Sequence, residues 1–260
     1  MSGRPVVLAA DDLVPSRWAA AEAERLRAPL QVVGTGNDVA RTRVTQLLRA
    51  SAPGAPVATR RVADPLGADL RRVSAGAELM VVSAAVGPRV VGAAVCPVAT
   101  VPPTVPPLGR VIVAVAPRTA PSVLDLAVHE ALARDAELVA VRVRGGPDAD
   151  SGDALPDVLA RWQRDLTHAC RDLRQALARW GADDADRRFR LLTVRGDPVP
   201  LLIALGIDAE LLVVGCSVHG AGAAVLAGDL VATVRCPVIG VPDPATPRGA
   251  TARQRVRSSS

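Results

Sequence analysis

The stretch whose residues are best suited to bind a ligand runs from Gly215 to Asp229, between two apolar segments of strand length. It holds further glycines at positions 220, 222 and 228 and a histidine at position 219. Glycines let backbone amides approach a ligand closely, above all an anion. If this chain holds a small molecule, we expect it there.

Less specific interpretations of the same residues stay open. The glycines could form a turn that packs a helix closely on a sheet, and His219 could be a solvated loop residue. Asp11, at the end of the first predicted strand, could cap a helix together with Asp12. Ser217 and His219 lack an acid to orient them, so no nucleophile and base are paired. We therefore predict a protein that is not an enzyme, with no catalytic residues and no metal site.

The elements around this stretch occur twice. Residues 209–216 (Ala-Glu-Leu-Leu-Val-Val-Gly-Cys) and 236–242 match residues 77–84 (Ala-Glu-Leu-Met-Val-Val-Ser-Ala) and 96–102. Continuous apolar runs of this length are typical of buried parallel strands. Strands alternate with helices in both halves, beginning and ending on a strand. We predict two α/β domains, each a five-stranded, mainly parallel sheet with helices on both faces.

Two Asp-Pro pairs are predicted to begin helices, Asp64-Pro65 and Asp197-Pro198. Aspartate accepts hydrogen bonds from the free amides of a first turn, and proline is tolerated there. The longest predicted helix covers residues 155–180, where apolar side chains recur at spacings of three and four. We expect its apolar face, which includes Leu159, to pack on the sheet.

A proline-rich connector separates the two copies. Residues 103–109 (Pro-Thr-Val-Pro-Pro-Leu-Gly) can neither continue a helix nor supply a central strand. This places one domain at residues 1–102 and a second at residues 110–242. Residues 243–260 are rich in Pro, Ala, Thr and Ser and carry four arginines, which predicts a disordered basic tail.

The composition limits the cellular compartment and the binding partners that we expect for this protein. No apolar run reaches the roughly 18 to 20 residues that cross a bilayer, so we expect a cytoplasmic protein without membrane contact. The four cysteines include no Cys-x-x-Cys pair, which favours reduced thiols. The net charge of +5 permits nucleic-acid binding. Stacking aromatics are scarce, so nucleic acid is not expected as a partner, and polyanion binding by the tail is a lesser alternative.

The order of elements, Gly-Asp-Pro at 196–198 and the paired Cys-Pro-Val segments at 96–98 and 236–238 resemble the universal stress protein family in its tandem form. The resemblance covers residues 4–242. It implies two adenine-nucleotide-alpha-hydrolase-like (Rossmann-like) domains. In members that bind ATP, a Gly-x2-Gly-x9-Gly-Ser/Thr loop wraps the phosphates, and an aspartate ending the first strand lies near the nucleoside.

Carried onto this sequence, the resemblance assigns ATP as the cofactor and a small set of residues to hold it. Gly215 and Gly228 match the first and third loop glycines, and Asp11 matches the first-strand aspartate of the first half. Gly220 would keep the loop flexible, and His219 would donate to a phosphate.

Neither copy keeps the full pattern. Val218 stands at the second glycine position and Asp229 at the Ser/Thr position, where repulsion from a polyphosphate would cost on the order of 1 kcal/mol without an intervening cation. Ala116 replaces the first-strand aspartate of the second half. In the first half Asp11 is kept, but the loop is shortened to residues 83–88.

We therefore expect a tandem universal stress protein that acts in the stress response through binding, with ATP binding degenerate or lost. The alternative is a nucleotide sensor that uses the second glycine loop and Arg118, with slow ATP hydrolysis. The resemblance, and the apolar character of the last strands, favour pairing of residues 96–101 with 236–241 as an internal pseudo-dimer. A homodimer and protein partners stay open.

Overall fold

The structure is a computed structural model that describes residues 3–9, 13–34, 38–103, 109–116, 119–144, 155–179, 189–216 and 230–242. The first half contains β1 (Val6–Leu8), α1 (Leu13–Arg25), β2 (Leu30–Gly34), α2 (Asp38–Ser51), β3 (Val57–Arg61), α3 (Leu70–Ala75), β4 (Leu79–Ser83), α4 (Gly87–Val90) and β5 (Val98–Val101). The predicted alternation of strands and helices is confirmed there.

The second half repeats this order. It contains β6 (Arg110–Val115), α5 (Pro121–Ala133), β7 (Glu137–Arg144), α6 (Leu155–Arg179), β8 (Phe189–Arg195), α7 (Pro198–Gly206), β9 (Leu211–Cys216) and β10 (Val238–Pro242). Residues 230–233, just before β10, are helical. No helix within the described ranges combines the length and the apolar character needed to cross a membrane.

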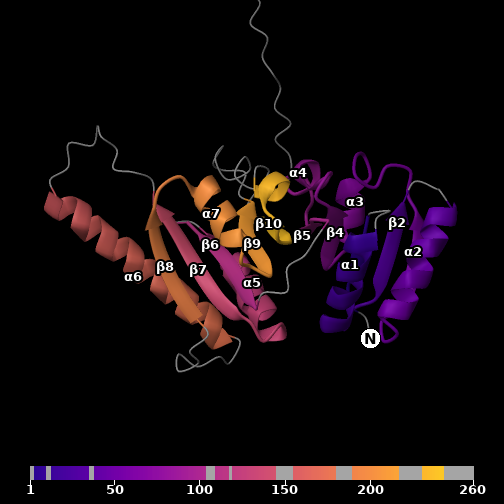
Figure 1. Ribbon diagram of the computed structural model, residues 1–260, viewed down its shortest axis with the longest axis horizontal. Helices are drawn as coiled ribbons and strands as arrows, with labels where there is room; N and C mark the ends of the chain where they lie inside the picture. The colour runs from indigo at the N-terminus through magenta and orange to yellow at the C-terminus, as the bar shows by residue number, and fades with distance from the viewer. Residues whose placement is uncertain are drawn as a thin grey trace, which may run out of the picture.

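All ten strands form one sheet, in the order β3-β2-β1-β4-β5-β10-β9-β6-β7-β8 (Figure 1). Neighbouring strands within each half are parallel, which confirms the predicted α/β class. The halves meet where β5 and β10 pair antiparallel, with Val238 opposite Thr100 and Gly240 opposite Val98. The predicted pairing of the two last strands is therefore present, and it joins two five-stranded sets.

Both faces of the inner strands are buried, as continuous apolar runs require, whereas the edge strand β3 is mostly exposed. Val6 and Leu8 of β1 point to one core with α1, α2 and α5, whereas Val7 points to the other core with α3, α4 and α7. The helices thus cover the sheet on both sides, as expected for the class.

Helix α6 differs from its prediction at its N-terminal end. Leu159 is 48% exposed, although it belongs to the predicted apolar face. β8 is the last strand of the sheet. In Figure 1 the start of α6 projects outward beyond β8. The apolar periodicity predicts the helix correctly, but it does not reveal that, among the described strands, none lies beyond β8 to cover this end.

Two glycines lie where the halves are in contact. A Cβ atom at Gly87 of α4 would lie 1.8 Å from Thr100 Cγ2 and 2.6 Å from Val231 Cγ1. A Cβ atom at Gly240 of β10 would lie 2.4 Å from Val91 Cγ1. The contact with Thr100 lies within the first half, whereas those of Gly87 with Val231 and of Gly240 with Val91 join opposite halves, so the absence of side chains at both glycines lets the halves pack closely.

Candidate functional site

The described part of the candidate site in the second half is the end of β9. Gly215 pairs in register with Val241 of β10. A Cβ atom at Gly215 would lie 3.3 Å from Val123 Cγ2, near the start of α5. A Cβ atom here would require the Val123 side chain to shift by a few tenths of an ångström, so Gly215 lies close to α5, and its role as ligand or packing residue stays a prediction.

Most of the predicted ligand residues lie outside the described part of the chain. These are His219, Gly220, Gly228, Asp229 and Asp11. Their roles stay predictions.

The turn after β6 differs from the family pattern, in which an aspartate ends the first strand of a domain. The Ala116 amide donates a hydrogen bond of 2.6 Å to Thr119 Oγ1. Ala120 precedes α5 and supplies no side-chain cap. Ser122 follows in the first turn of α5, and its buried Oγ has no hydrogen-bond partner. Two hydroxyl residues, which the sequence reasoning did not single out, therefore lie near the end of the first strand.

The shortened loop of the first half is described throughout, and three backbone amides in it and just after it are hydrogen-bonded to carbonyl oxygens. The Ala84 amide donates to Val101 O at 3.1 Å, and the Val86 amide donates to Ser83 O at 3.2 Å. The Arg89 amide donates to Val86 O at 3.1 Å. The chain passes directly from β4 into α4, so these three amides do not face outward as an anion cradle would require.

The two Asp-Pro pairs behave differently. Asp197 caps α7, because its Oδ1 accepts a 3.0 Å hydrogen bond from the Val199 amide, as predicted. Asp64 instead accepts from the Ala68 amide at 2.9 Å within a turn, and α3 begins only at Leu70. The prediction of a helix starting at Pro65 is wrong, because the Asp64 carboxylate stabilises this turn.

The cysteines near the strand ends are not nucleophiles. Burial raises the pKa of Cys96, Cys216 and Cys236 to about 12 each. A thiol is reactive only as thiolate, so these side chains act as small apolar groups at neutral pH. All four cysteines are free, as predicted. Among the described residues, no group of three or more His, Cys, Asp or Glu could hold a metal ion.

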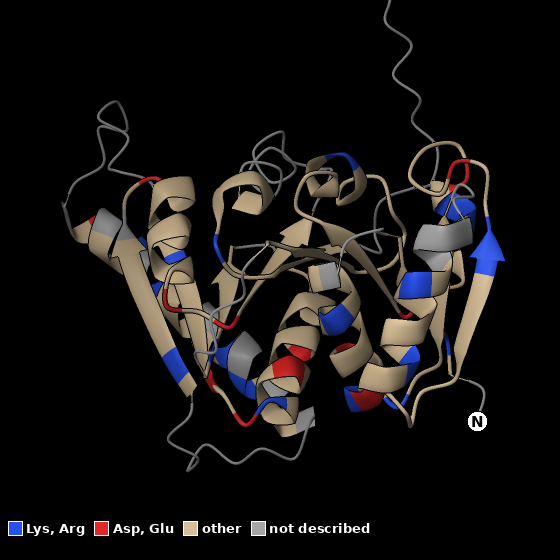
Figure 2. Ribbon diagram, turned by 45° about the vertical axis from the view of Figure 1, so that its right-hand side comes forward, with Lys and Arg blue, Asp and Glu red and all other residues tan. Residues whose placement is uncertain are grey.

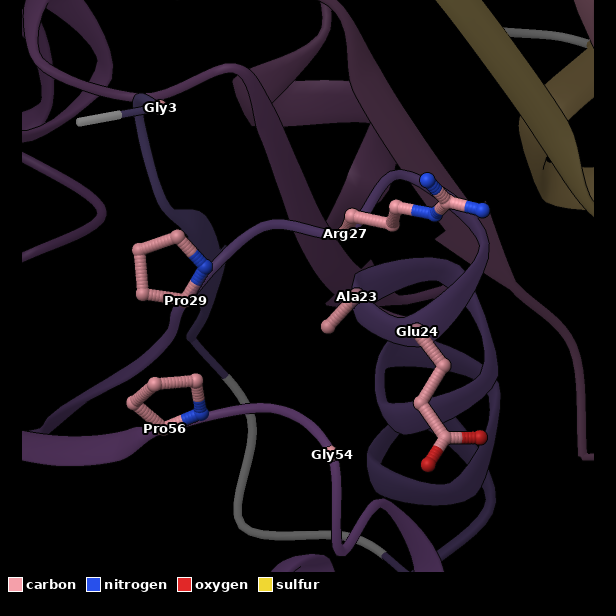
Figure 3. A pocket seen from close by; sticks show the side chains of 7 residues that line it. All are labelled: Gly3, Ala23, Glu24, Arg27, Pro29, Gly54 and Pro56. Carbon is pink, nitrogen blue, oxygen red and sulfur yellow. The ribbon is translucent and has the colours of Figure 1, made fainter. Parts of the chain in front are cut away.

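A cavity of about 380 Å³ lies at the opposite end of the first-half strands (Figure 3). Its lining includes Pro29 and Pro56, which immediately precede β2 and β3. The side chains of Arg27 and Glu24 extend away from these prolines. Ligands of open parallel sheets bind at the carboxyl ends of strands, and the polar groups here do not converge. The cavity is therefore not the candidate site.

A parallel sheet covered by helices on both faces defines a Rossmann-like α/β protein. The universal stress protein family model matches residues 107–242. The chain therefore belongs to the universal stress protein family, as its motifs predict. A comparison with the curated proteins finds no match.

Comparison with solved structures finds one that agrees in fold over most of the chain and shorter ones that match about half of it. A universal stress protein from Archaeoglobus fulgidus DSM 4304 is 14% identical, covers 92% of this chain and 96% of its own, and has a TM-score of 0.56. A universal stress protein in complex with cAMP is 22% identical over 52% of this chain and 97% of its own, with a TM-score of 0.38. Another from Archaeoglobus fulgidus, in complex with dAMP, is 21% identical over 51% of this chain and 96% of its own, with a TM-score of 0.35.

Proposed function

We propose that this chain is a tandem universal stress protein that acts in the stress response by binding, without catalysis. Its domains are residues 1–102 and 110–242. The first domain does not hold a nucleoside triphosphate, and the glycine loop of the second is a degenerate ATP site. Protein partners then receive the signal through the surface of the paired domains.

The observation that carries this proposal is that three backbone amides in and just after the first-half loop are already hydrogen-bonded. Amides of Ala84, Val86 and Arg89 already donate to carbonyl oxygens within 3.2 Å. Turning them toward a phosphate would break these hydrogen bonds, each with a net contribution of about 1 kcal/mol. It would also disturb the close packing of Gly87 against Thr100. The net free energy gained by binding a triphosphate at this edge is therefore small.

A second candidate is a nucleotide sensor confined to the second domain. Two observations favour it: the family match covers the half that keeps the long glycine loop, and Ser122 presents a buried hydroxyl without a partner. Val123, the next residue of α5, lies against Gly215. In this alternative, Ser122 replaces one of the groups lost from the loop, and MgATP binds with slow hydrolysis.

Titration calorimetry of the purified full chain separates the two candidates. MgATP, dAMP and cAMP are each titrated into the wild type, Gly228→Val and Ser122→Ala. We expect no saturable binding with a Kd below about 1 mM for any nucleotide. Micromolar binding of MgATP that Gly228→Val abolishes would establish the sensor instead. A phosphate-release assay on the same samples should give no turnover above buffer.

A further inference from the structure

A buried cluster of charged side chains lies between the halves, on the face that α1 and α5 cover. Arg134 is only 2% exposed, and Glu22 and Glu130 are 1% exposed. Arg134 donates through Nη2 to Glu22 of the first half and through Nη1 to Glu130 of its own half. Figure 2 places acidic and basic segments beside one another on these central helices. One guanidinium thus binds a carboxylate from each half.

Further groups complete this cluster. Arg134 Nε lies 3.5 Å from Glu210 Oε1, and Arg134 Cζ lies 6.0 Å from the ring centroid of Trp18 in the first half. Arg25 also donates to Glu22, whose second oxygen has no partner. A charge in such a site is tolerated only when it is paired, so each side chain depends on the others.

The two glutamates occupy equivalent positions in the repeated helices. After α1, the Ala28 amide donates to Ala23 O at 2.9 Å, and after α5 the Ala136 amide donates to Ala131 O at the same distance. The residue before each donor is left-handed, with φ of 49° at Arg27 and 54° at Asp135. These identical helix ends fix the alignment.

By this alignment, Glu22 corresponds to Glu130, whereas Arg134 corresponds to Leu26. The arginine is therefore present in one half only. A group that binds both members of a symmetry-related pair lies near the axis that relates them. A second arginine, placed by the same symmetry, would have to share that position.

We propose that Arg134 is the residue that makes the two halves specific for each other. Two first halves paired in this way would bury two carboxylates, each with its own Arg25, but without an arginine on the axis to join them. Two second halves would bring two guanidiniums together on the axis. Only the unlike pair brings one arginine to two glutamates, so the surface fits the other half of this chain and rejects a second copy of either half.

Single substitutions in the full chain reproduce each rejected pairing. Arg134→Leu gives the axis the leucines of two first halves, and Glu130 then lacks an arginine because Ala133 stands at the position of Arg25. Leu26→Arg gives it the composition of two second halves, with arginine at both. Leu26→Arg/Arg134→Leu moves the single arginine to the equivalent position, from which it can again bind Glu22 and Glu130.

Hydrogen exchange of the β5 and β10 amides is the measurement, with β2 and β7 as internal references away from the junction. We expect exchange in β5 and β10 to rise on the order of 100-fold in each single variant, since an unbalanced buried charge is costly. The double variant should return to within about tenfold of the wild type. If a single variant does not fold, recovery of folding in the double variant gives the same support.

Two results would overturn the proposal. One is a double variant in which the rise in exchange equals the product of the two single rises, which means that the free-energy effects are additive, because Arg134 would then act only through local packing. The other is wild-type exchange in Leu26→Arg, because two arginines would then be accommodated on the axis.

Discussion

Gly87 provides a direct test of how closely α4 packs against β5 of its own half and against the other half. In Gly87→Ala, the added Cβ would lie 1.8 Å from Thr100 Cγ2 and 2.6 Å from Val231 Cγ1. Carbon atoms in contact are normally about 3.5–4.0 Å apart, so β5, α4 or the helical segment before β10 must shift. The position is buried and not left-handed, so the cost comes from packing and not from the backbone.

The expected cost follows from two opposing effects. Overpacking a filled site costs about 1–3 kcal/mol. Replacing glycine by alanine at a compatible backbone gains about 0.4–1 kcal/mol, because the unfolded chain loses freedom. We therefore expect Gly87→Ala to lower the free energy of unfolding by about 1–2 kcal/mol.

Urea unfolding followed by circular dichroism measures this effect, with unchanged m-values as a check. Gly92→Ala is the matched control, because Gly92 is exposed and a Cβ there meets nothing within 4 Å. Thr100→Ser removes Cγ2 but keeps the hydroxyl that donates to Val238 O at 3.1 Å, so it should partly rescue Gly87→Ala. The reasoning is refuted if Gly87→Ala is as stable as Gly92→Ala, or if Thr100→Ser gives no rescue.

Three further outcomes are expected. The free energy of unfolding should fall as pH rises from 9 to about 12, because native Cys236 keeps a proton that the unfolded chain loses; in urea titrations Cys236→Ala should flatten this slope by about 1.4 kcal/mol per pH unit. Asp197→Ala should cost about 1 kcal/mol in thermal unfolding through loss of the α7 cap, while the exposed Asp208→Ala should change stability little. Leu202→Ala should cost about 2–5 kcal/mol, but Leu159→Ala less than about 0.5 kcal/mol, because only Leu202 is buried.

The fold was predictable because its signals are local and repeated. Apolar runs of strand length, such as Leu211–Cys216, are buried strands in the structure. The cap at Asp197 was also predictable, since the carboxylate and the amide that it binds are two residues apart. Asp64-Pro65 shows the limit: the same dipeptide stabilises a turn there. The difference depends on how residues 65–69 fold, which the dipeptide does not encode.

The candidate site was predictable only in outline. Its place at the end of β9 follows from the parallel sheet, and Gly215 lies there. Thr119 and Ser122 were missed, because a lone hydroxyl residue after a strand has no distinctive spacing. Their positions depend on how α5 packs on the sheet.

The sequence by itself determined the family and the repeated α/β alternation, because both rest on periodicity and on motifs within short segments. The pairing of the last strands was expected from the family resemblance and from their apolar character. Only the tertiary structure decided which charges meet. Glu22 falls on the apolar face of its helix, which indicates that it is buried. No pattern in the sequence near Glu22 indicates that Arg134 is its partner. The contact exists because pairing of β5 with β10 brings α1 and α5 together, and the burial that results makes the pairing of charges obligatory.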